Sequence, residues 1–151
     1  MDACKLPSKE KANKSICDIL KNSKIIVVVG LSPKEHRASN QVAKYMQNEG
    51  YKIIPIYPRE DEILGEKVYR DLEEIEFKVD IVDIFRKSED TPEIVKKATN
   101  LKGLKCIFLQ EGVKNETSKQ IANESNIFYV EDKCIMIEHM RCKKEDLLWF
   151  H

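Results

Sequence analysis

The chain has 151 residues, 42% of them apolar and 34% charged, and its 26 Lys and Arg residues balance 26 Asp and Glu residues to a formal net charge of zero. A single domain of this size can bury roughly 68–70% of its unfolded surface, so it needs no disulfide bond to hold a core. The balanced charge argues against general binding to nucleic acid or to an anionic membrane, and no apolar run is long enough for a membrane helix.

The amino-terminal segment and the cysteines bear on location. The first 22 residues are charged throughout and lack the apolar core of a signal peptide. The five cysteines are odd in number and include no C-x-x-C pair, which predicts reduced thiols. We therefore expect a cytoplasmic protein.

Apolar periodicity predicts, in chain order, a leading helix and then strands that alternate with helices. The leading helix covers residues 8–22 and presents one apolar face, formed by Ile16, Ile19 and Leu20. The predicted strands cover residues 25–29, 51–56, 80–85, 105–109 and 126–130, and the first and third of them are rich in β-branched residues. The helices between them present the apolar residues Val42, Ala43 and Met46, then Ile94, Val95 and Ala98, and finally cover residues 116–125.

Local signals define some helix ends. Ser39 or Asn40 stands where the N-cap of the first crossover helix is expected, and Gly50 stands where that helix stops. After the last strand, two short helices are predicted over residues 134–140 and 145–150, the second containing the apolar run Leu147-Leu148-Trp149-Phe150. This run could serve a contact between copies of the chain or be buried within one chain.

The alternation of strands and helices predicts right-handed crossovers and a parallel sheet. The expected fold is α/β, a doubly wound Rossmann-like sheet of about five strands in the order 3-2-1-4-5, with helices on both faces. The chain is then one domain, with a leading helix in residues 1–22, a Rossmann-like core in residues 23–141 and an extension in residues 142–151. Ligands of such sheets bind beyond the carboxyl ends of the strands, so the residues after each strand form the candidate site.

The loop after the first strand favours phosphate binding over an ordinary exposed loop. Gly30 allows a tight turn and a close approach of the backbone to a ligand. Ser32 offers an N–H and a hydroxyl, Arg37 can hold a phosphate through two parallel bonds, and Lys34 adds a charge nearby. The helix that follows offers unpaired N–H groups at the positive end of its dipole.

The second strand end leaves the class of nucleotide open. The NAD fingerprint G-x-G-x-x-G is absent, because Ser32 and Glu35 stand where its second and third glycines would be. Tyr57, Pro58 and Arg59 stand where a ribose-binding acid is expected. An arginine there suits a phosphate on the ribose, which occurs in NADP and as the 3′-phosphate of coenzyme A.

The third and fourth strand ends give weaker signals. Phe85 and Arg86 are able to sandwich an adenine or contact a phosphate, or they are a core phenylalanine beside a surface arginine. Gln110 and Gly112 allow close backbone approach or form a plain turn.

No catalytic set and no metal-ligand cluster is predicted. The three histidines are far apart in sequence, and no nucleophile elbow or Walker loop is present. Cys134 is either a reactive thiol or inert packing, and we expect His139 to be a structural histidine.

These segments together resemble the small single-domain CoA-binding proteins of bacteria and archaea, which are similar to the CoA-binding domain of the succinyl-CoA synthetase alpha subunit. The similarity covers about residues 15–141 and rests on five motifs. In this chain they are G-L-S-x-x-x-x-R-x-S from Gly30, I-L-G-E-x-V-Y at 63–69, V-D-I-V-D-I-F-R at 79–86, Q-x-G-V-x-N from Gln110, and D-x-C-x-x-I-E-H from Asp132.

The resemblance implies a domain that binds coenzyme A or an acyl-CoA without evident catalytic machinery, as a sensor or carrier. It places the diphosphate around Gly30, Leu31, Ser32, Arg37 and Ser39. The adenosine part would lie near Tyr57, Pro58, Arg59, Phe85 and Arg86, and the pantetheine arm would run toward Gln110 and Gly112. Two alternatives remain open, an NAD(P)-binding oxidoreductase or redox sensor and the CoA-binding subunit of an acyl-CoA ligase. The expected partner is a small nucleotide ligand, with no nucleic acid or membrane, and with a homo-oligomer possible.

Overall fold

The computed structural model describes residues 9–145 of the chain. Five parallel strands form one sheet, and they are β1 (Ile25–Val29), β2 (Lys52–Ile56), β5 (Ile81–Ile84), β6 (Cys106–Leu109) and β7 (Phe128–Val130). A separate antiparallel ribbon consists of β3 (Glu62–Ile63) and β4 (Glu66–Lys67). The predicted α/β class and parallel Rossmann-like sheet are therefore confirmed, and each predicted strand occurs within one residue or two of its expected place.

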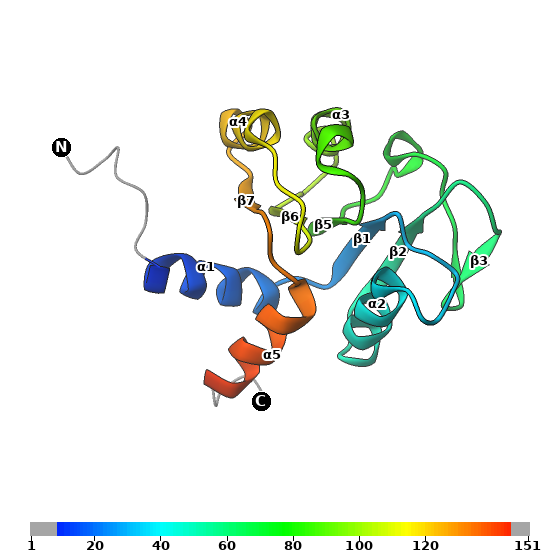
Figure 1. Ribbon diagram of the computed structural model, residues 1–151, viewed down its shortest axis with the longest axis horizontal. Coiled ribbons are helices and arrows are strands. Elements are labelled where there is room, and N and C mark those ends of the chain that lie inside the picture. The colour runs from blue at the N-terminus through cyan, green and yellow to red at the C-terminus, as the bar shows by residue number, and fades with distance from the viewer. Residues whose placement is uncertain (1–8, 146–151) are drawn as a thin grey trace.

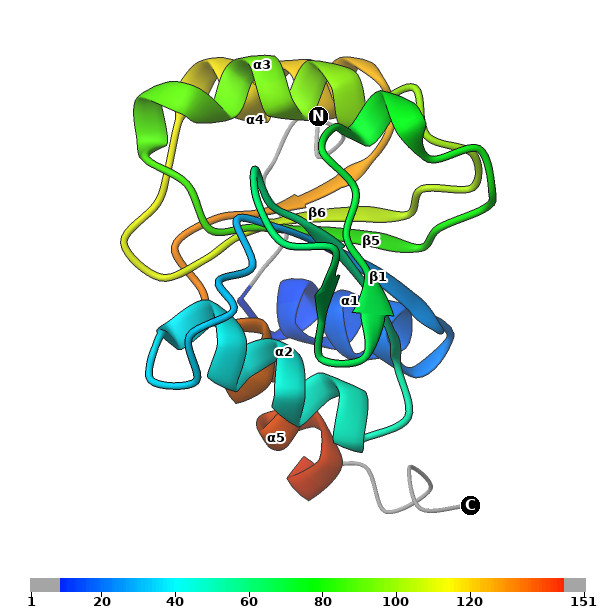
Figure 2. The same cartoon turned by 90° about the vertical axis from the view of Figure 1, so that its right-hand side faces the viewer.

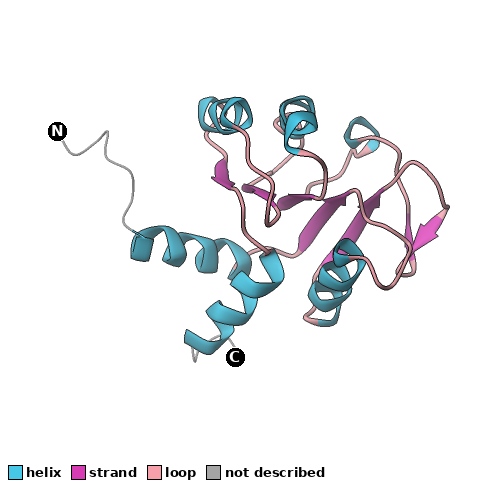
Figure 3. Cartoon of the chain, in the orientation of Figure 1, coloured by secondary structure: helices cyan, strands magenta, loops and turns pink. Residues whose placement is uncertain are grey.

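Helices cover both faces of the sheet, as Figures 1 and 3 show. One face carries α1 (Lys9–Lys21), α2 (Ala38–Asn48) and α5 (Ile135–Glu145). The other carries α3 (Thr91–Ala98), α4 (Glu116–Glu124) and the 3-10 turns η2 (Leu72–Glu74) and η3 (Ser88–Asp90). Figure 2 shows the two layers of helices edge-on, with the strands between them. Within the described residues, no helix is both long enough and apolar enough to cross a membrane.

Each face of the sheet buries its own apolar core. Ile26, Val28 and Phe108 face α1, α2 and α5, whereas Val27 and Ile107 face α3 and α4. The alternation of neighbouring residues between the two cores is what a strand with a side-chain period of two requires. The sheet is thus covered on both sides, as the continuous β-branched runs predicted.

The strand order differs from the predicted one. The sheet runs β2-β1-β5-β6-β7, which is 2-1-3-4-5 in chain order, so the expected order 3-2-1-4-5 is wrong. The outer edge of β2, where a third strand was expected, is partly occupied by the connection itself, because Tyr69 bridges Ile56 there and its N–H donates to Pro55. The connection then buries Leu72 and Ile75 in the same core as β1 and leads to β5 on the far side of β1.

This order moves the topological switch point to the gap between β1 and β5. β1 pairs with β2 on one side and with β5 on the other, so the chain leaves the sheet in opposite directions at this point. Ligands of open α/β sheets bind at such a reversal. The ends of β1 and β5, rather than those of β1 and β6, therefore flank the candidate site.

Two further predictions need correction. Cys17 of α1 and Cys142 of α5 form a disulfide with a Cα–Cα distance of 5.5 Å, although reduced thiols were expected. Both helices pack on the same face of the sheet, which brings together two cysteines separated by 125 positions. At the carboxyl-terminal end α5 runs through Glu145 and is longer than the helix predicted over residues 134–140, whereas the helix predicted over residues 145–150, with the Leu147–Phe150 run, lies outside the described residues apart from Glu145.

Candidate functional site

Gly30 directly follows β1, and its backbone lies against Phe85, the residue that follows β5. Its φ is 84°, a left-handed value, and a Cβ built on it would lie 2.4 Å from the carbonyl oxygen of Phe85. The Gly30 N–H donates to Ile56 at the end of β2 at 2.9 Å. The first turn of the loop is therefore fixed between two neighbouring strand ends, and any side chain at this position would collide with backbone.

The loop from Ser32 is tied to the first turn of α2. The N–H of Ser32 donates to Ser39 Oγ at 3.0 Å, and Asn40 Nδ2 donates to the carbonyl of Ser32 at 2.9 Å. Neither side chain caps the helix as predicted, since α2 begins at Ala38 and its N-cap is Arg37, which makes no side-chain cap bond. The side chains of Ser39 and Asn40 instead form hydrogen bonds with the backbone of Ser32 in the loop.

The amino terminus of α2 is the one best suited to an anion. Its first turn holds no acidic residue, and within the described residues the amides of Ala38, Ser39 and Asn40 have no acceptor. The other helices on this edge of the sheet bring carboxylates to their own amino ends. Those carboxylates belong to Glu89, Asp90 and Glu93 at α3, Glu116 at α4 and Glu138 at α5. Unpaired N–H groups and the positive end of the dipole therefore remain available at α2.

A cavity of about 410 Å³ opens in front of this helix end. We call it the strand-end cavity, and its lining consists of Gly30, Ser32, Lys34, Arg37, Ala38, Ser39, Tyr57, Arg59 and Phe85. None of these residues is acidic, although the chain as a whole carries no net charge. In the described part of the chain no carboxylate lies within 4.0 Å of Lys34, Arg37 or Arg59. Three uncompensated cations thus surround a helix amino terminus.

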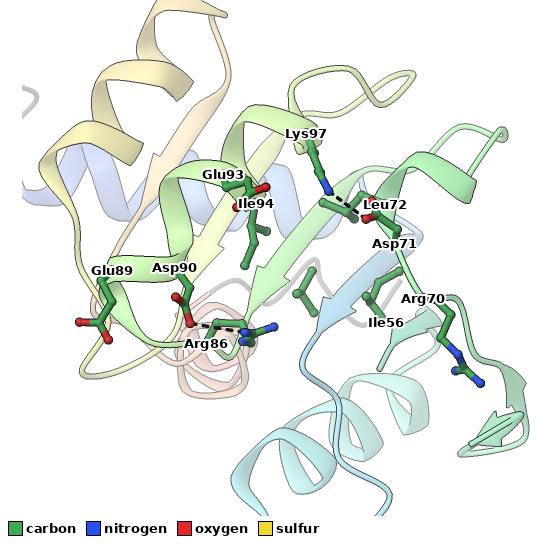
Figure 4. A pocket seen from close by; sticks show the side chains of 11 residues that line it. Ile56, Arg70, Asp71, Leu72, Arg86, Glu89, Asp90, Glu93, Ile94 and Lys97 are labelled. Carbon is green, nitrogen blue, oxygen red and sulfur yellow. Dashed lines mark hydrogen bonds and ion pairs between the residues drawn. The ribbon is translucent and has the colours of Figure 1, made fainter. Parts of the chain in front are cut away.

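Two further cavities continue from it across the ends of β1, β2 and β5. The central cavity, of about 460 Å³, shares Gly30, Tyr57 and Phe85 with the strand-end cavity and adds Pro58 and Arg86. The α3 cavity, of about 320 Å³, lies beyond Arg86 and contains carboxylates. Figure 4 shows two of its ion pairs, Arg86 with Asp90 at 3.4 Å and Lys97 with Asp71 at 2.9 Å. Negative charge is therefore confined to the α3 end of the groove.

The structure brings most of the predicted site residues together in these cavities. The residues that line the strand-end or central cavity are Gly30, Ser32, Arg37, Ser39, Tyr57, Pro58, Arg59, Phe85 and Arg86. Leu31 is different, because its side chain is fully buried in the core and its N–H faces the carbonyl of Ile56 at 3.3 Å. Gln110 and Gly112 line none of the three cavities; they follow β6, and Gly112 donates to Asp132 at 2.7 Å.

Arg70 is a residue of this groove that the sequence analysis missed. It lines the central and α3 cavities, and its Nη1 donates to three backbone carbonyls of the loop that follows β2. A single arginine in a charged connection carries no periodic signal. Arg70 directly follows Tyr69, which pairs with the edge of β2. Its place in the groove could be inferred only if that pairing were already known.

Asp83 lies in β5, lines none of the three cavities, and was not singled out from the sequence. It is 1% exposed, faces the same side of the sheet as Phe85, and neither carboxylate oxygen has a hydrogen-bond partner in the described residues. Burial raises the pKa of Asp83 to about 8. A charged residue inside an apolar strand was the available signal.

The two candidate reactive groups behave as packing elements. Cys134 is half-buried, its sulfur accepts N–H groups of Met136 and Ile137 at the start of α5, and burial raises the pKa of its thiol. His139 is fully buried, with Nδ1 2.9 Å from the hydroxyl of Tyr45 and its ring edge-on to Tyr51. Burial lowers the pKa of His139, which favours the neutral imidazole and agrees with the structural role predicted for it.

Comparisons with known proteins identify the family of the chain. The family model described as CoA binding domain matches residues 24–140. The uncharacterized protein YneT of Bacillus subtilis (strain 168) is 40% identical over 124 residues, covering 82% of this chain and 91% of that protein. A solved structure of a hypothetical protein from Pyrococcus horikoshii OT3 is similar with a TM-score of 0.82 and 36% identity, covering 87% of this chain and 92% of that one.

A larger protein contains a similar region. The ADP-forming acetate–CoA ligase of Methanocaldococcus jannaschii is 25% identical over 122 residues. That match covers 76% of this chain but only 17% of the ligase. The family match itself begins just before β1 and ends within α5, so it includes every strand end that forms the groove. The chain belongs to the CoA binding domain family.

Proposed function

We propose that this protein binds coenzyme A or an acyl-CoA in the groove at the carboxyl ends of β1, β2 and β5, as a carrier or sensor. The observation that carries the proposal is the acid-free, cationic strand-end cavity in front of α2. Coenzyme A combines a diphosphate, a ribose phosphate and a long neutral arm, so it needs cations at one end of its site only. The proposal concerns binding and assigns no reaction.

The diphosphate is assigned to the start of α2. The amides of Ala38, Ser39 and Asn40 are available there, and Gly30 lets the backbone come close. Arg37 stands at the N-cap and supplies a guanidinium without a competing carboxylate. Since the N–H of Ser32 is already bound to Ser39, we assign the hydroxyl groups of these two serines, rather than that N–H, to the phosphate oxygens.

The adenosine part is assigned to the central cavity. Arg59 follows β2 and faces the strand-end cavity, a position that suits the 3′-phosphate on the ribose. Half-buried Phe85 and the guanidinium of Arg86 line one wall, and Tyr57 and Pro58 line the other. Stacking on an aromatic ring and on a guanidinium suits the flat adenine. The pantetheine arm is then directed along the strand ends toward Gln110 and Gly112.

NADP is the closest competitor, because it also has a diphosphate and a ribose phosphate. NADP would bind to the same cationic side chains. We favour coenzyme A over NADP because the glycine fingerprint of NAD-binding proteins is missing after Gly30. A role as the CoA-binding part of a ligase is a third possibility, supported by the match to part of the acetate–CoA ligase. Both are outcomes that a binding experiment separates.

The test is isothermal titration calorimetry with CoA, acetyl-CoA, NAD, NADP and ATP. We expect CoA to bind, and Arg37→Ala to weaken CoA binding about tenfold or more, the effect of losing one charged hydrogen bond. Arg141→Ala is the control, since Arg141 pairs with Glu138 and Glu145 on α5. Binding of NADP without binding of CoA, or equal effects of the two substitutions, would refute the proposal. Formation of an acyl-CoA and ADP from a carboxylic acid, CoA and ATP when a partner chain is added would support the ligase role instead.

A further inference from the structure

The guanidinium of Arg70, although its side chain is 46% exposed, is bound by the loop that follows β2. Its Nη1 lies 3.1 Å from the carbonyl oxygen of Tyr57, 3.0 Å from that of Arg59 and 2.8 Å from that of Glu60. The three oxygens converge because Glu60 adopts a left-handed φ of 68°, which turns the loop back on itself. The Asp61 carboxylate is 3.9 Å from Nη2 and fully exposed, so it adds little.

The rest of the structure fixes the loop only at its ends. The N–H of Tyr57 donates to Tyr69 at 3.1 Å, and the carbonyl of Asp61 accepts from Val68 at 3.0 Å. Between these points, the backbone of residues 58–60 makes no hydrogen bond in the described part of the chain except those with Arg70. The position of the loop tip therefore depends on one side chain.

That loop tip carries Arg59, whose side chain has no carboxylate partner and faces the strand-end cavity. Its contacts are weak and local, a 3.4 Å hydrogen bond to the hydroxyl of Tyr57 and a 5.7 Å approach to the same ring. Arg70 itself lines the central and α3 cavities but not the strand-end cavity. Its effect on a ligand group held by Arg59 is thus indirect.

Arg70 also changes the electrostatics of the loop. Without it, three carbonyl oxygens would direct their partial negative charge at one point beside a site for anions. The three bonds are exposed to solvent, so water would replace the guanidinium without holding the three oxygens together, and the loop would open. Opening moves Arg59 away from the cavity that it lines.

We propose that Arg70 is a positioning residue for Arg59 and thereby sets selectivity for a ligand with a phosphomonoester on its ribose. The inference rests on the proposed function, in which Arg59 contacts the 3′-phosphate of CoA. Arg70 touches the loop and not that phosphate, so its substitution acts on the difference between CoA and 3′-dephospho-CoA. A residue with a merely structural role would weaken the binding of both ligands equally.

The experiment compares the dissociation constants of CoA and 3′-dephospho-CoA for the unmodified protein, Arg59→Ala, Arg70→Met and the double variant. We expect about tenfold or greater preference for CoA in the unmodified protein, and a preference near one in Arg59→Ala. Arg70→Met should lose most of the preference, and adding it to Arg59→Ala should reduce the preference no further. Arg141→Met removes an arginine elsewhere and should keep the full preference.

A second readout needs no ligand. Trypsin should cleave after Arg59 faster in Arg70→Met than in the unmodified protein or in Arg141→Met, because the loop tip has lost its attachment. Unchanged cleavage, a full preference for CoA in Arg70→Met, or equal affinity of the unmodified protein for the two ligands would each overturn the inference. Failure of the unmodified protein to bind either ligand would instead refute the proposed function, and the cleavage rates would still report on the loop.

Discussion

The hydroxyl oxygen of Ser39 accepts the backbone N–H of Ser32 at 3.0 Å, across seven positions of the chain. Ser39 is 6% exposed, so this bond is shielded from water and joins the loop after β1 to the first turn of α2. A loop fixed in this way loses little conformational freedom when a ligand binds, which favours affinity. The loop at the candidate site is thus fixed by the protein's own side chains.

Ser39→Ala should lower both stability and ligand affinity. It leaves the N–H of Ser32 without its partner in a partly buried place, which costs about 1–3 kcal/mol. Affinity for CoA should fall as well, because the loop loosens and a hydroxyl donor disappears. Chemical denaturation and calorimetry measure the two effects. Ser125→Ala is the matched control, since Ser125 is exposed and its side chain makes no hydrogen bond with any described residue. Equal results for the two variants would contradict this prediction.

Gly30→Ala should be more damaging than an ordinary glycine substitution. The new Cβ would lie 2.4 Å from the carbonyl of Phe85, and the left-handed φ of 84° adds strain of about 1–2 kcal/mol. Gly50→Ala separates the two effects, because Gly50 has a φ of 101° but no atom within 4 Å of the added Cβ. We expect both variants to lower the free energy of unfolding, with Gly30→Ala clearly the worse. Equal losses would mean that the contact with β5 is unimportant.

Much of the fold could be predicted because its signals are local. Five apolar runs and the apolar stripes between them place the strands and helices, and glycine after the first strand points to the loop at α2. The strand order could not be predicted in this way. It depends on which edge of β1 the third strand joins, and that was decided by Tyr69 occupying the edge of β2 and by the burial of Leu72 over β1.

In the candidate site, too, some features could be predicted from the sequence and others depend on the tertiary structure. Arg37 and Arg59 lie in the loops that follow β1 and β2, so their common location could be inferred from parallel pairing alone. The role of Arg70 could not, since it needs the left-handed turn at Glu60 to bring three carbonyls together. The Cys17–Cys142 disulfide likewise depends on two helices packing side by side, which no spacing in the sequence reports.

The Cys17–Cys142 disulfide should stabilise the fold by about 2–4 kcal/mol, because it closes a loop of 125 positions in the unfolded chain. Dithiothreitol should therefore lower Tm, by about 2–4 °C for each kcal/mol lost in a chain of this size. Cys17→Ser should start with the lower Tm and show no response to reductant. Cys134→Ser removes a cysteine outside the pair and should respond as the unmodified protein does. A Tm insensitive to dithiothreitol in the unmodified protein would show that the bond is absent or without effect.

Asp83 should make stability fall as pH rises through the neutral range. Its folded pKa of about 8 lies far above the value of about 3.9 expected in the unfolded chain. Between these values the folded state holds a proton that the unfolded state has released, so the free energy of unfolding decreases with pH. One such group contributes a slope of at most about 1.4 kcal/mol per pH unit. The stabilisation is complete below about pH 4 and is lost as pH approaches the folded pKa.

Asp83→Asn isolates this contribution because asparagine keeps the shape and does not titrate. The variant should gain stability relative to the unmodified protein as pH rises from 5 to 8, and the difference should level off above the folded pKa of about 8. Urea denaturation at several pH values gives the two curves. His139 works in the opposite direction below about pH 6.5, since its lowered pKa means that stability falls as pH drops there, and both proteins share this effect. Parallel curves for the two proteins would show that Asp83 is ionised in the folded state, with a partner or water molecules that offset its burial.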